Sequence, residues 1–288
     1  MNPEFFVISL LNGVSYGLLL FMLSSGLTLI FSMMGVLNFA HASFYMVGAY
    51  FGYTISEWIG FWPALVIAPL LVGACGALFE RLTLRKVHPF GHVPELLVTF
   101  GLSVVIQNGL LSTFTADSQK LTAGSIEAAS VDLGVVTLGV MPVLTFGSAV
   151  LVIFLLNQLF YRTALGRAFR ATSDDATTAQ LMGIRPQRVF AMATGIAMVV
   201  ATIAALFLGT RANFDPSIGP ARLLYAFEAV IIGGLGSLWG TLAGGIVIGL
   251  AQAIGASINP EWQILSGHIA FVLVLLIRPR GLFPRAND

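Results

Sequence analysis

The chain has 288 residues, of which 57% are hydrophobic and only 9% are charged. Soluble domains carry roughly a quarter of charged residues, so this composition excludes a soluble protein and predicts a polytopic membrane protein. The formal net charge of +1 argues against nucleic acid as a partner and leaves the lipid bilayer as the expected surroundings. We therefore expect an all-α fold in which residues 1–288 form a single transmembrane domain.

A helix needs about 20 predominantly apolar residues to cross a bilayer. Nine runs approach this length, at residues 5–31, 38–56, 63–80, 95–114, 140–161, 189–210, 223–234, 240–257 and 262–277. The second run follows a Gly-containing interruption and the seventh is short, so both are candidates for discontinuous or re-entrant segments. We predict eight or nine crossings. Cys75, the only cysteine, lies in the third run, where we expect it to be a small packing residue.

Basic residues cluster at three places, which sets the expected orientation. The clusters are Arg81, Arg85 and Lys86; Arg162, Arg167, Arg170, Arg185 and Arg188; and Arg278, Arg280 and Arg285. Because cytoplasmic loops carry an excess of Lys and Arg, all three are predicted to be cytoplasmic. Alternation of nine segments agrees with this placement. It puts the C-terminus inside and the N-terminus outside.

The loop 162–188 contains its own helix signals. Ser173 is predicted to cap a helix over about 173–183, with Asp174 and Asp175 in its first turn, where the helix dipole favours negative charge. Gly183 is a predicted C-terminal stop, and Pro186 follows it at the usual distance. A short capped helix in the main basic loop suggests a contact surface for a cytoplasmic partner.

Glycines recur at four-residue spacing, which is typical of close helix packing in lipid. The repeats are Gly13 and Gly17, Gly48 and Gly52, Gly245 and Gly249, and the triplet Gly236, Gly240 and Gly244. Packing within the chain is the favoured interpretation. A dimer face is the alternative, and the two are compatible.

Two Gly-interrupted segments carry polar residues. In the first, Gly35 precedes Asn38, His41 and Tyr45, which would share one face of a helix that Asn38 could cap. Broken helices expose backbone groups beside water-filled cavities, and transporters use such ends to receive charged substrates. These residues are therefore substrate-pathway candidates. The alternative is that Asn38 and His41 hydrogen-bond neighbouring helices and fix the fold.

The second interrupted segment carries Glu228, the one acidic residue inside a strongly apolar run that Gly233, Gly234 and Gly236 then break. An ionisable residue in a span is a functional candidate by default, because its burial is costly unless it is paired or hydrated. The expected partners are Arg211, Arg222 or His41, and the alternative role is structural or interfacial. Interrupted segments in both halves of a chain also suggest an inverted repeat with a pathway at its interface.

Signatures of catalysis are missing from the sequence. It has no His-Glu-x-x-His, no Gly-x-Ser-x-Gly and no Gly-x-x-x-x-Gly-Lys-Ser/Thr motif, so we predict neither hydrolysis nor ATP binding by this chain. His88 and His92 could ligate a metal, but we interpret them as ordinary loop residues and expect no metal site. Energy for uphill transport would have to come from a separate subunit.

Three blocks of sequence carry a family resemblance: GLTLIFSMMGVLNFAHASFYMVGAY, GRAFRATSDDATTAQLMGI and AVIIGGLGSLWGTLAGGIVIG. Together they resemble the LivH-type permease subunit of branched-chain amino acid ABC importers, over about residues 10–282. The resemblance implies a second, LivM-like permease, two cytoplasmic ATPase subunits that hold ATP and magnesium, and a periplasmic binding protein. It also implies a location in the bacterial inner membrane.

The resemblance further implies that the loop helix couples the permease to the ATPase. Its Ala-x-x-x-Gly core is similar to Ala179–Gly183, which includes Leu181, whereas Asp174, Asp175 and Ala176 match the family pattern only loosely. The expected function is import of branched-chain or related amino acids by alternating access. An ATP-independent channel or facilitator for small polar solutes and a structural subunit are the alternatives. The resemblance also leaves other amino acids, urea, amides and aromatic acids open as substrates. It does not decide whether the permease pair is a homodimer or a heterodimer.

Overall fold

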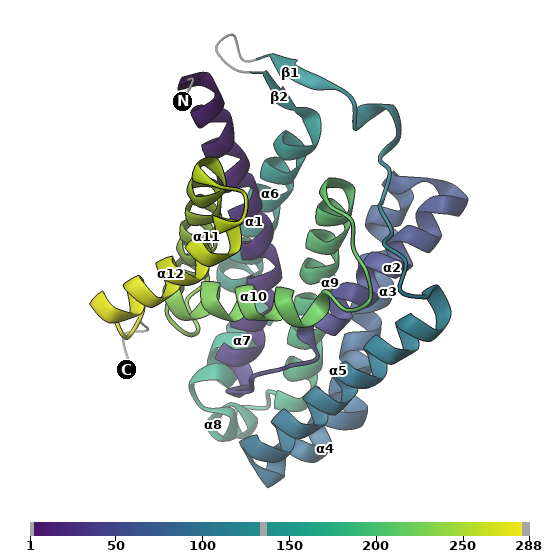
Figure 1. Ribbon diagram of the computed structural model, residues 1–288. Helices are drawn as coiled ribbons and strands as arrows, with labels where there is room; N and C mark the ends of the chain where they lie inside the picture. The colour runs from purple at the N-terminus through teal and green to yellow at the C-terminus, as the bar shows by residue number, and fades with distance from the viewer. Residues whose placement is uncertain (1–2, 133–136, 284–288) are drawn as a thin grey trace.

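The computed structural model describes residues 3–132 and 137–283, and Arg285 of the third basic cluster lies outside them. Every predicted apolar run forms a helix (Figure 1). These helices are α1 (Pro3–Met34), α2 (His41–Ile59), α3 (Phe61–Phe79), α5 (His92–Phe114), α6 (Val140–Arg162), α9 (Pro186–Arg211), α10 (Gly219–Gly233), α11 (Leu238–Ile258) and α12 (Trp262–Ile277). The predicted all-α, polytopic fold class is confirmed.

Shorter elements connect these helices. A π-helical turn η1 (Glu80–Leu84), α4 (Arg85–Val87) and a 3-10 turn η2 (His88–Phe90) follow α3, while α7 (Ala164–Asp174) and α8 (Ala176–Leu181) lie between α6 and α9. Between α5 and α6 lie a 3-10 turn η3 (Gly124–Ile126) and two antiparallel strands, β1 (Ser130–Asp132) and β2 (Thr137–Gly139). Ser130 pairs with Gly139, and Asp132 pairs with Thr137.

Six helices in the described ranges are long and apolar enough to cross a membrane: α1, α3 with its extension to Phe90, α5, α6, α9 and α11. This number is smaller than the eight or nine crossings that we predicted. The remaining three helices, α2, α10 and α12, lie outside this set of long apolar helices. α12 has 16 residues and α10 has 15, and Figure 1 shows α10 lying across the long helices rather than along them. A helix of that length and direction is too short for a full crossing.

The two ends of the molecule differ in what they carry. The start of α1 and the β1–β2 pair lie at one end, and α4, α7 and α8 lie at the other (Figure 1). The basic loops at 81–86 and 162–188 therefore share one end of the molecule, opposite the start of α1. This arrangement agrees with the alternation predicted for these segments.

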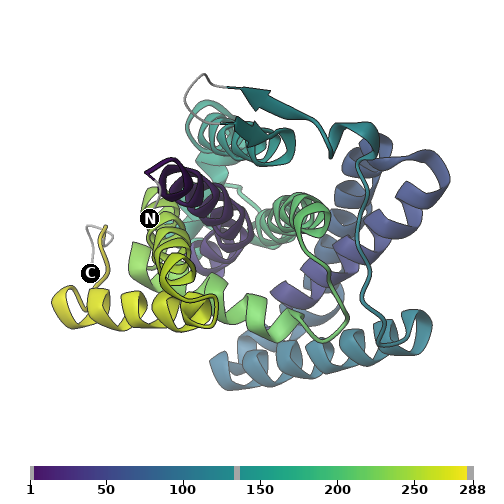
Figure 2. The ribbon, with the colours of Figure 1, turned by 45° about the horizontal axis from the view of Figure 1, so that its top comes forward.

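α1 lies at the centre of the bundle, between α11 and α9, with α6 beside it (Figure 2). Its middle is buried, including Phe21, Met22 and Ile30. The approach of α1 to α11 depends on glycine: a Cβ on Gly17 would lie 2.6 Å from the carbonyl oxygen of Gly245, and a Cβ on Gly245 would lie equally close to that of Gly17. The two backbones are therefore in direct contact, which favours packing within the chain.

Most glycines of the other repeats also face neighbouring helices of the same chain, whereas Gly236 of the predicted triplet lies in the turn between α10 and α11. Gly48 and Gly52 of α2 meet Thr202 and Leu206 of α9, while Gly240 and Gly244 of α11 meet the backbone of Gly233 and Ala229 in α10.

The prediction that Cys75 is a packing residue is wrong. Its side chain is exposed on α3 rather than packed, because the uniformly apolar sequence of this helix does not indicate which face is buried.

Candidate functional site

The loop between α6 and α9 folds into two helices that meet at Asp175. Thr163 caps α7, since its Oγ1 accepts a hydrogen bond from the backbone N–H of Gly166 at 3.0 Å. Asp175 is extended and caps α8, its Oδ1 accepting from the N–H groups of Thr177 and Thr178 at 2.9 and 3.1 Å. The prediction that Ser173 caps this helix is wrong. Ser173 and Asp174 lie in the last turn of α7, because the helix begun at Thr163 continues through them.

α8 ends where the sequence predicted. Gly183 has a φ of 84°, its N–H donates to the carbonyl of Gln180, and the N–H of Ile184 donates to that of Ala179. Ala179 is buried, whereas the side chains of Leu181 and Met182 are 84% and 80% exposed. This turn of the chain thus presents two large apolar side chains at the tip of a polar loop. Such side chains outside the apolar spans are suited to contact another protein.

α7 is fixed to the ends of three long helices. Phe169 is fully buried in a cluster that includes Met33 of α1 and Val189 of α9. Arg170 Nη1 donates to the carbonyl of Phe160 in α6, and Ser173 Oγ donates to the carbonyl of Ser32 in α1. α7 therefore connects α8 to α1, α6 and α9.

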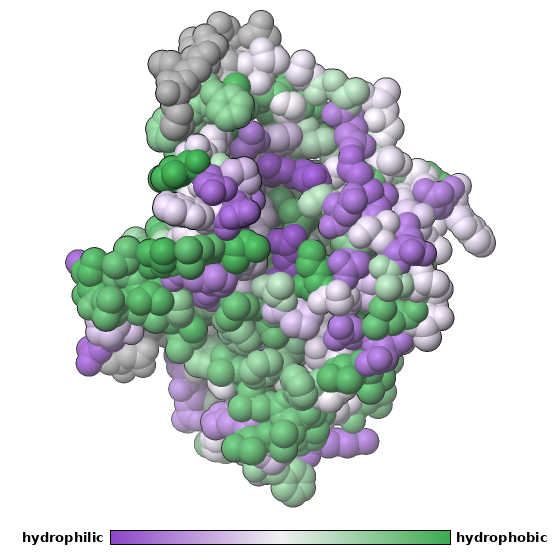
Figure 3. Space-filling model, in the orientation of Figure 1, coloured by the Kyte–Doolittle hydropathy of each residue, from purple (hydrophilic) through white to green (hydrophobic). Residues whose placement is uncertain are grey.

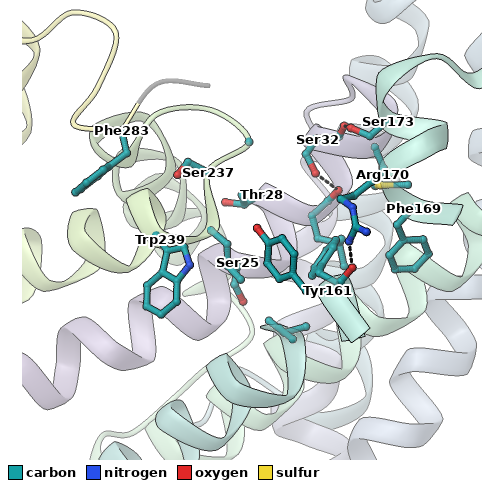
Figure 4. A pocket seen from close by; sticks show the side chains of 16 residues that line it. Ser25, Thr28, Ser32, Tyr161, Phe169, Arg170, Ser173, Ser237, Trp239 and Phe283 are labelled. Atoms are coloured by element: carbon teal, nitrogen blue, oxygen red, sulfur yellow. Dashed lines mark hydrogen bonds between the residues drawn. The ribbon is translucent and has the colours of Figure 1, made fainter. Parts of the chain in front are cut away.

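A pocket of about 280 Å³ lies beside α7 (Figure 4). α1, α6, α7 and the turn between α10 and α11 surround it. Hydroxyl and aromatic side chains line much of its wall: Ser25, Thr28, Ser32, Ser173, Ser237, Tyr161, Trp239 and Phe283. Arg170 supplies a cation at the same place, with its guanidinium 5.4 Å above the ring of Tyr161. The pocket combines hydrogen-bonding groups with apolar surface, as small-molecule sites do.

The first set of predicted pathway residues does not lie in this pocket. Asn38 and His41 are fully buried. Asn38 Oδ1 accepts from the N–H of Ala40 at 3.0 Å, and His41 Nε2 donates to the carbonyl of Leu23 at 2.9 Å. The helix α2 begins at His41 with Ala40 as its cap, so Asn38 neither caps it nor shares a helix face with His41 and Tyr45. Gly35, at a φ of 67°, ends α1 just before this turn.

Glu228 has a partner that differs from those predicted. Its Oε1 lies 2.5 Å from Nδ1 of His268 in α12, whereas we expected Arg211, Arg222 or His41. The ring of His268 also stacks on Tyr225, with centroids 5.4 Å apart and planes within 7°. Glu228 is almost fully buried, and its Oε2 has no hydrogen-bond partner in the described structure. The contact connects α10 to α12.

The break after α10 is made by Gly234 and Gly236, which have φ values of 98° and 82°.

Comparison with known proteins decides the family. The model for "Branched-chain amino acid transport system / permease component" matches residues 9–277. The chain belongs to this permease family. It is 29% identical to the high-affinity branched-chain amino acid transport system permease protein BraD of Pseudomonas aeruginosa, over 96% of this chain and 95% of BraD. It is 28% identical to the permease protein LivH of Escherichia coli K12, over 99% of this chain and 98% of LivH.

The permease also has a structural neighbour. PsaBC from Streptococcus pneumoniae, solved in complex with Fab, superposes with a TM-score of 0.51 at 13% identity. The match covers 93% of the permease and 91% of that chain. At this identity the likeness shows a shared fold. The family and the apolar helices together make the chain a multi-pass membrane transport protein.

The histidines after α3 belong to a small ionic cluster in the permease. Both His88 and His92 contact the carboxylate of Glu95 through Nδ1, the second at 3.4 Å. Nearby, Arg85 pairs with Glu80 at 2.8 Å and donates to the carbonyl of Gln187 at the start of α9. Within residues 3–132 and 137–283, no group of three or more His, Cys, Asp or Glu side chains is arranged to hold a metal ion.

Residues that sequence reasoning missed share one property. Tyr16, His268 and the lining of the pocket in Figure 4 come from distant parts of the permease, and no local pattern connects them. Arg222, which the sequence analysis offered as a partner of Glu228, contacts one of these residues instead. In the structure its Nη1 donates to the hydroxyl of Tyr16 at 2.8 Å, with Tyr45 buried close by.

Proposed function

We propose that the permease is the membrane-spanning subunit of an ATP-driven importer, which moves branched-chain or related amino acids into the cytoplasm by alternating access. The observation that carries this proposal is the exposed pair Leu181 and Met182 at the tip of α8. Family membership supports the transport role, and the apolar pair supplies a surface for an ATPase outside this chain.

In this proposal α8 is the coupling helix, and residues 162–188 lie in the cytoplasm. The basic clusters at both ends of this loop favour that side, as do those at 81–86 and 278–280. The C-terminus is then cytoplasmic, and the N-terminus is periplasmic if α2, α10 and α12 also carry the chain across, as the nine-segment alternation requires. Two ATPase subunits bind ATP and magnesium, and a binding protein delivers the amino acid at the opposite face. A second, LivM-like permease completes the path.

The contacts of α7 give the coupling a mechanical route. Closure of the ATPase pair moves α8, and α7 passes the movement to α1, α6 and α9 through Phe169, Arg170 and Ser173. ATP can shift the equilibrium between the inward and outward states only by binding the ATPase more tightly in one of them. That difference reaches the permease only if the connection between α8 and the long helices is rigid. The capped ends of α8 provide such stiffness.

The experiment replaces Leu181 or Met182 with Asp and reconstitutes the permease with its partner subunits. Stimulation of ATP hydrolysis by loaded binding protein and uptake of leucine are then measured. We expect both activities to fall at least about tenfold, because burying a carboxylate in the apolar contact removes a large part of the binding free energy between α8 and the ATPase. Gln180→Ala, on the same exposed helix, is the matched control and retains both activities. Undiminished stimulation in Leu181→Asp and Met182→Asp contradicts the coupling role, and leucine uptake without ATP favours a facilitator.

A further inference from the structure

Two guanidinium groups face one phenol near the middle of α1, in the half of the bundle that contains the start of that helix. Arg222 of α10 donates from Nη1 to the hydroxyl of Tyr16, and Arg211 at the end of α9 donates from Nη1 to the hydroxyl of Ser15, both at 2.8 Å. In the described ranges, neither guanidinium has a carboxylate within 4 Å. The carboxylates that follow these arginines in sequence are engaged elsewhere, since Asp215 accepts from Ser217 and Glu228 pairs with His268.

Unpaired cations at this place are costly. Both arginines are only partly exposed, and Nε of Arg222 is buried without a hydrogen-bond partner among the described residues. A charge inside a membrane domain is usually paired, hydrated or functional. Two guanidiniums without an acidic partner therefore indicate a site for an anion that arrives from outside the chain.

A pocket of about 390 Å³ opens beside these groups. Tyr16 and Arg211 form part of its wall, together with the polar side chains of Asn12, Gln252 and Gln263 and the apolar side chains of Ile8 and Ala256. Nε2 of Gln252 is another buried donor without a partner in the described structure. Figure 3 shows hydrophilic side chains gathered in a hollow above α10.

We propose that this pocket binds the carboxylate of the transported amino acid, with Arg211 in its wall and Arg222 behind Tyr16 as its cationic groups. This inference rests on the proposed import function, because it assigns the site to that substrate. The planar guanidinium matches a carboxylate with two parallel hydrogen bonds. The amide oxygens of Asn12 and Gln252 are acceptors for the ammonium group, and Ile8 and Ala256 offer apolar surface to a branched side chain. Tyr16 positions Arg222 through its hydroxyl.

A phosphate of an anionic lipid has the same charge, so the experiment separates the two sources. Ala256→Cys in a Cys75→Ser background places one thiol in the pocket of the full transporter assembly in proteoliposomes. The rate of its modification by a neutral thiol reagent is measured without ATP. L-leucine is expected to slow modification several-fold, while 3-methylbutylamine, which lacks the carboxylate, leaves the rate unchanged.

Variants assign the protection to the two cations. Arg222→Gln and Arg211→Gln are expected to raise the half-protecting leucine concentration about tenfold or more, as loss of one charged hydrogen bond implies. Arg222→Lys, which retains the charge without the planar fork, and Tyr16→Phe should give intermediate shifts. These two conservative variants also cover the case in which a Gln variant fails to fold. Arg81→Gln, an exposed arginine at the other end, is the matched control.

Three results overturn the proposal. They are equal protection by leucine and 3-methylbutylamine, no protection at any leucine concentration, and protection that follows the phosphatidylglycerol content of the vesicles instead of leucine. The last result assigns the arginines to a lipid headgroup. Because labelling needs no ATP, these failures are distinct from failure of the coupling proposal, which appears as unchanged ATPase stimulation in Leu181→Asp.

Discussion

Nδ1 of His268 lies 2.5 Å from Oε1 of Glu228, and this contact joins α12 to the helix that crosses the bundle. We predict that His268→Ala lowers the free energy of unfolding by about 1–3 kcal/mol, because it leaves a buried carboxyl group without its partner. Glu228→Ala should cost less, since His268 is one-third exposed and water can replace the lost contact. A double-mutant cycle measured by chemical unfolding in detergent should give a coupling energy of about 0.5–3 kcal/mol. Additive effects of the two substitutions would show that the contact contributes nothing.

The same pair tests whether Glu228 belongs to the substrate path. Glu228→Gln retains a carbonyl oxygen that accepts from His268 but removes the ionisable group. We predict that leucine uptake and its pH dependence stay unchanged in this variant, because the contact with His268 favours a structural role. A lower rate of leucine uptake in Glu228→Gln, with an unchanged free energy of unfolding, would instead identify Glu228 as a pathway residue.

The approach of α1 to α11 predicts a sharp difference between glycines. Gly245→Ala places a methyl group 2.6 Å from the carbonyl oxygen of Gly17, and the helices have to separate. We expect a loss of about 1–3 kcal/mol from this overpacking, seen as a lower thermal unfolding temperature in nanodiscs. Gly147→Ala in α6 is the matched control. A Cβ there meets nothing within 4 Å, so the change should raise helix stability by up to about 1 kcal/mol. Equal unfolding temperatures for the two variants would contradict the contact.

The helices of the permease were readable from sequence because a bilayer forces long apolar runs to be helical. The direction of α10 was not readable from sequence, since it depends on the packing of this helix against α11 and α1. Three consecutive residues, Ser173, Asp174 and Asp175, are all good helix caps by type. Which of them caps depends on where the preceding helix ends, and that helix starts at Thr163.

Side-chain partners were the least predictable feature. Glu228 and His268 are 40 residues apart, and only the placement of α12 beside α10 brings them together. Nothing in the spacing of Arg211, Arg222 and Tyr16 indicates that they meet. The polarity of each residue is unusual in an apolar chain, but only the fold brings the three together.

The cap of α8 predicts a pH dependence. Hydrogen bonds from the hydroxyl of Thr178, and from the N–H groups of Thr178 and Thr177, hold the pKa of Asp175 below its ordinary value. A carboxyl group with a lowered pKa in the folded state stabilises it above the ordinary pKa of Asp, near 3.9, and this stabilisation is lost as the pH falls through the lowered value. Protection of the α8 amides in hydrogen exchange, corrected for intrinsic rates, should be constant from about pH 5 to 8 and fall only in stronger acid.

Two variants separate the charge of Asp175 from its hydrogen bonds. Asp175→Asn keeps an oxygen acceptor, so we expect protection of the α8 amides that is weaker but independent of pH. Asp175→Ala lacks the acceptor and should lower protection at every pH. Identical exchange in Asp175→Ala and the parent protein would show that another contact holds the start of α8.

Gly166 lies at the corner between α6 and α7, where a Cβ would overlap the carbonyl oxygens of Leu159 and Phe160. Gly166→Ala is predicted to open this corner and to weaken the contacts of Arg170 with α6 and of Ser173 with α1. Because those contacts connect α8 to the long helices in our proposal, stimulation of ATP hydrolysis by loaded binding protein should fall at least about tenfold. Hydrogen exchange should show faster opening of residues 164–174. Thr163→Ala is the control. It removes the cap of α7, which lowers stability by about 1 kcal/mol, but it places no extra atoms in the corner. Full stimulation with unchanged exchange in Gly166→Ala would mean that movement of α8 reaches the membrane helices by another route.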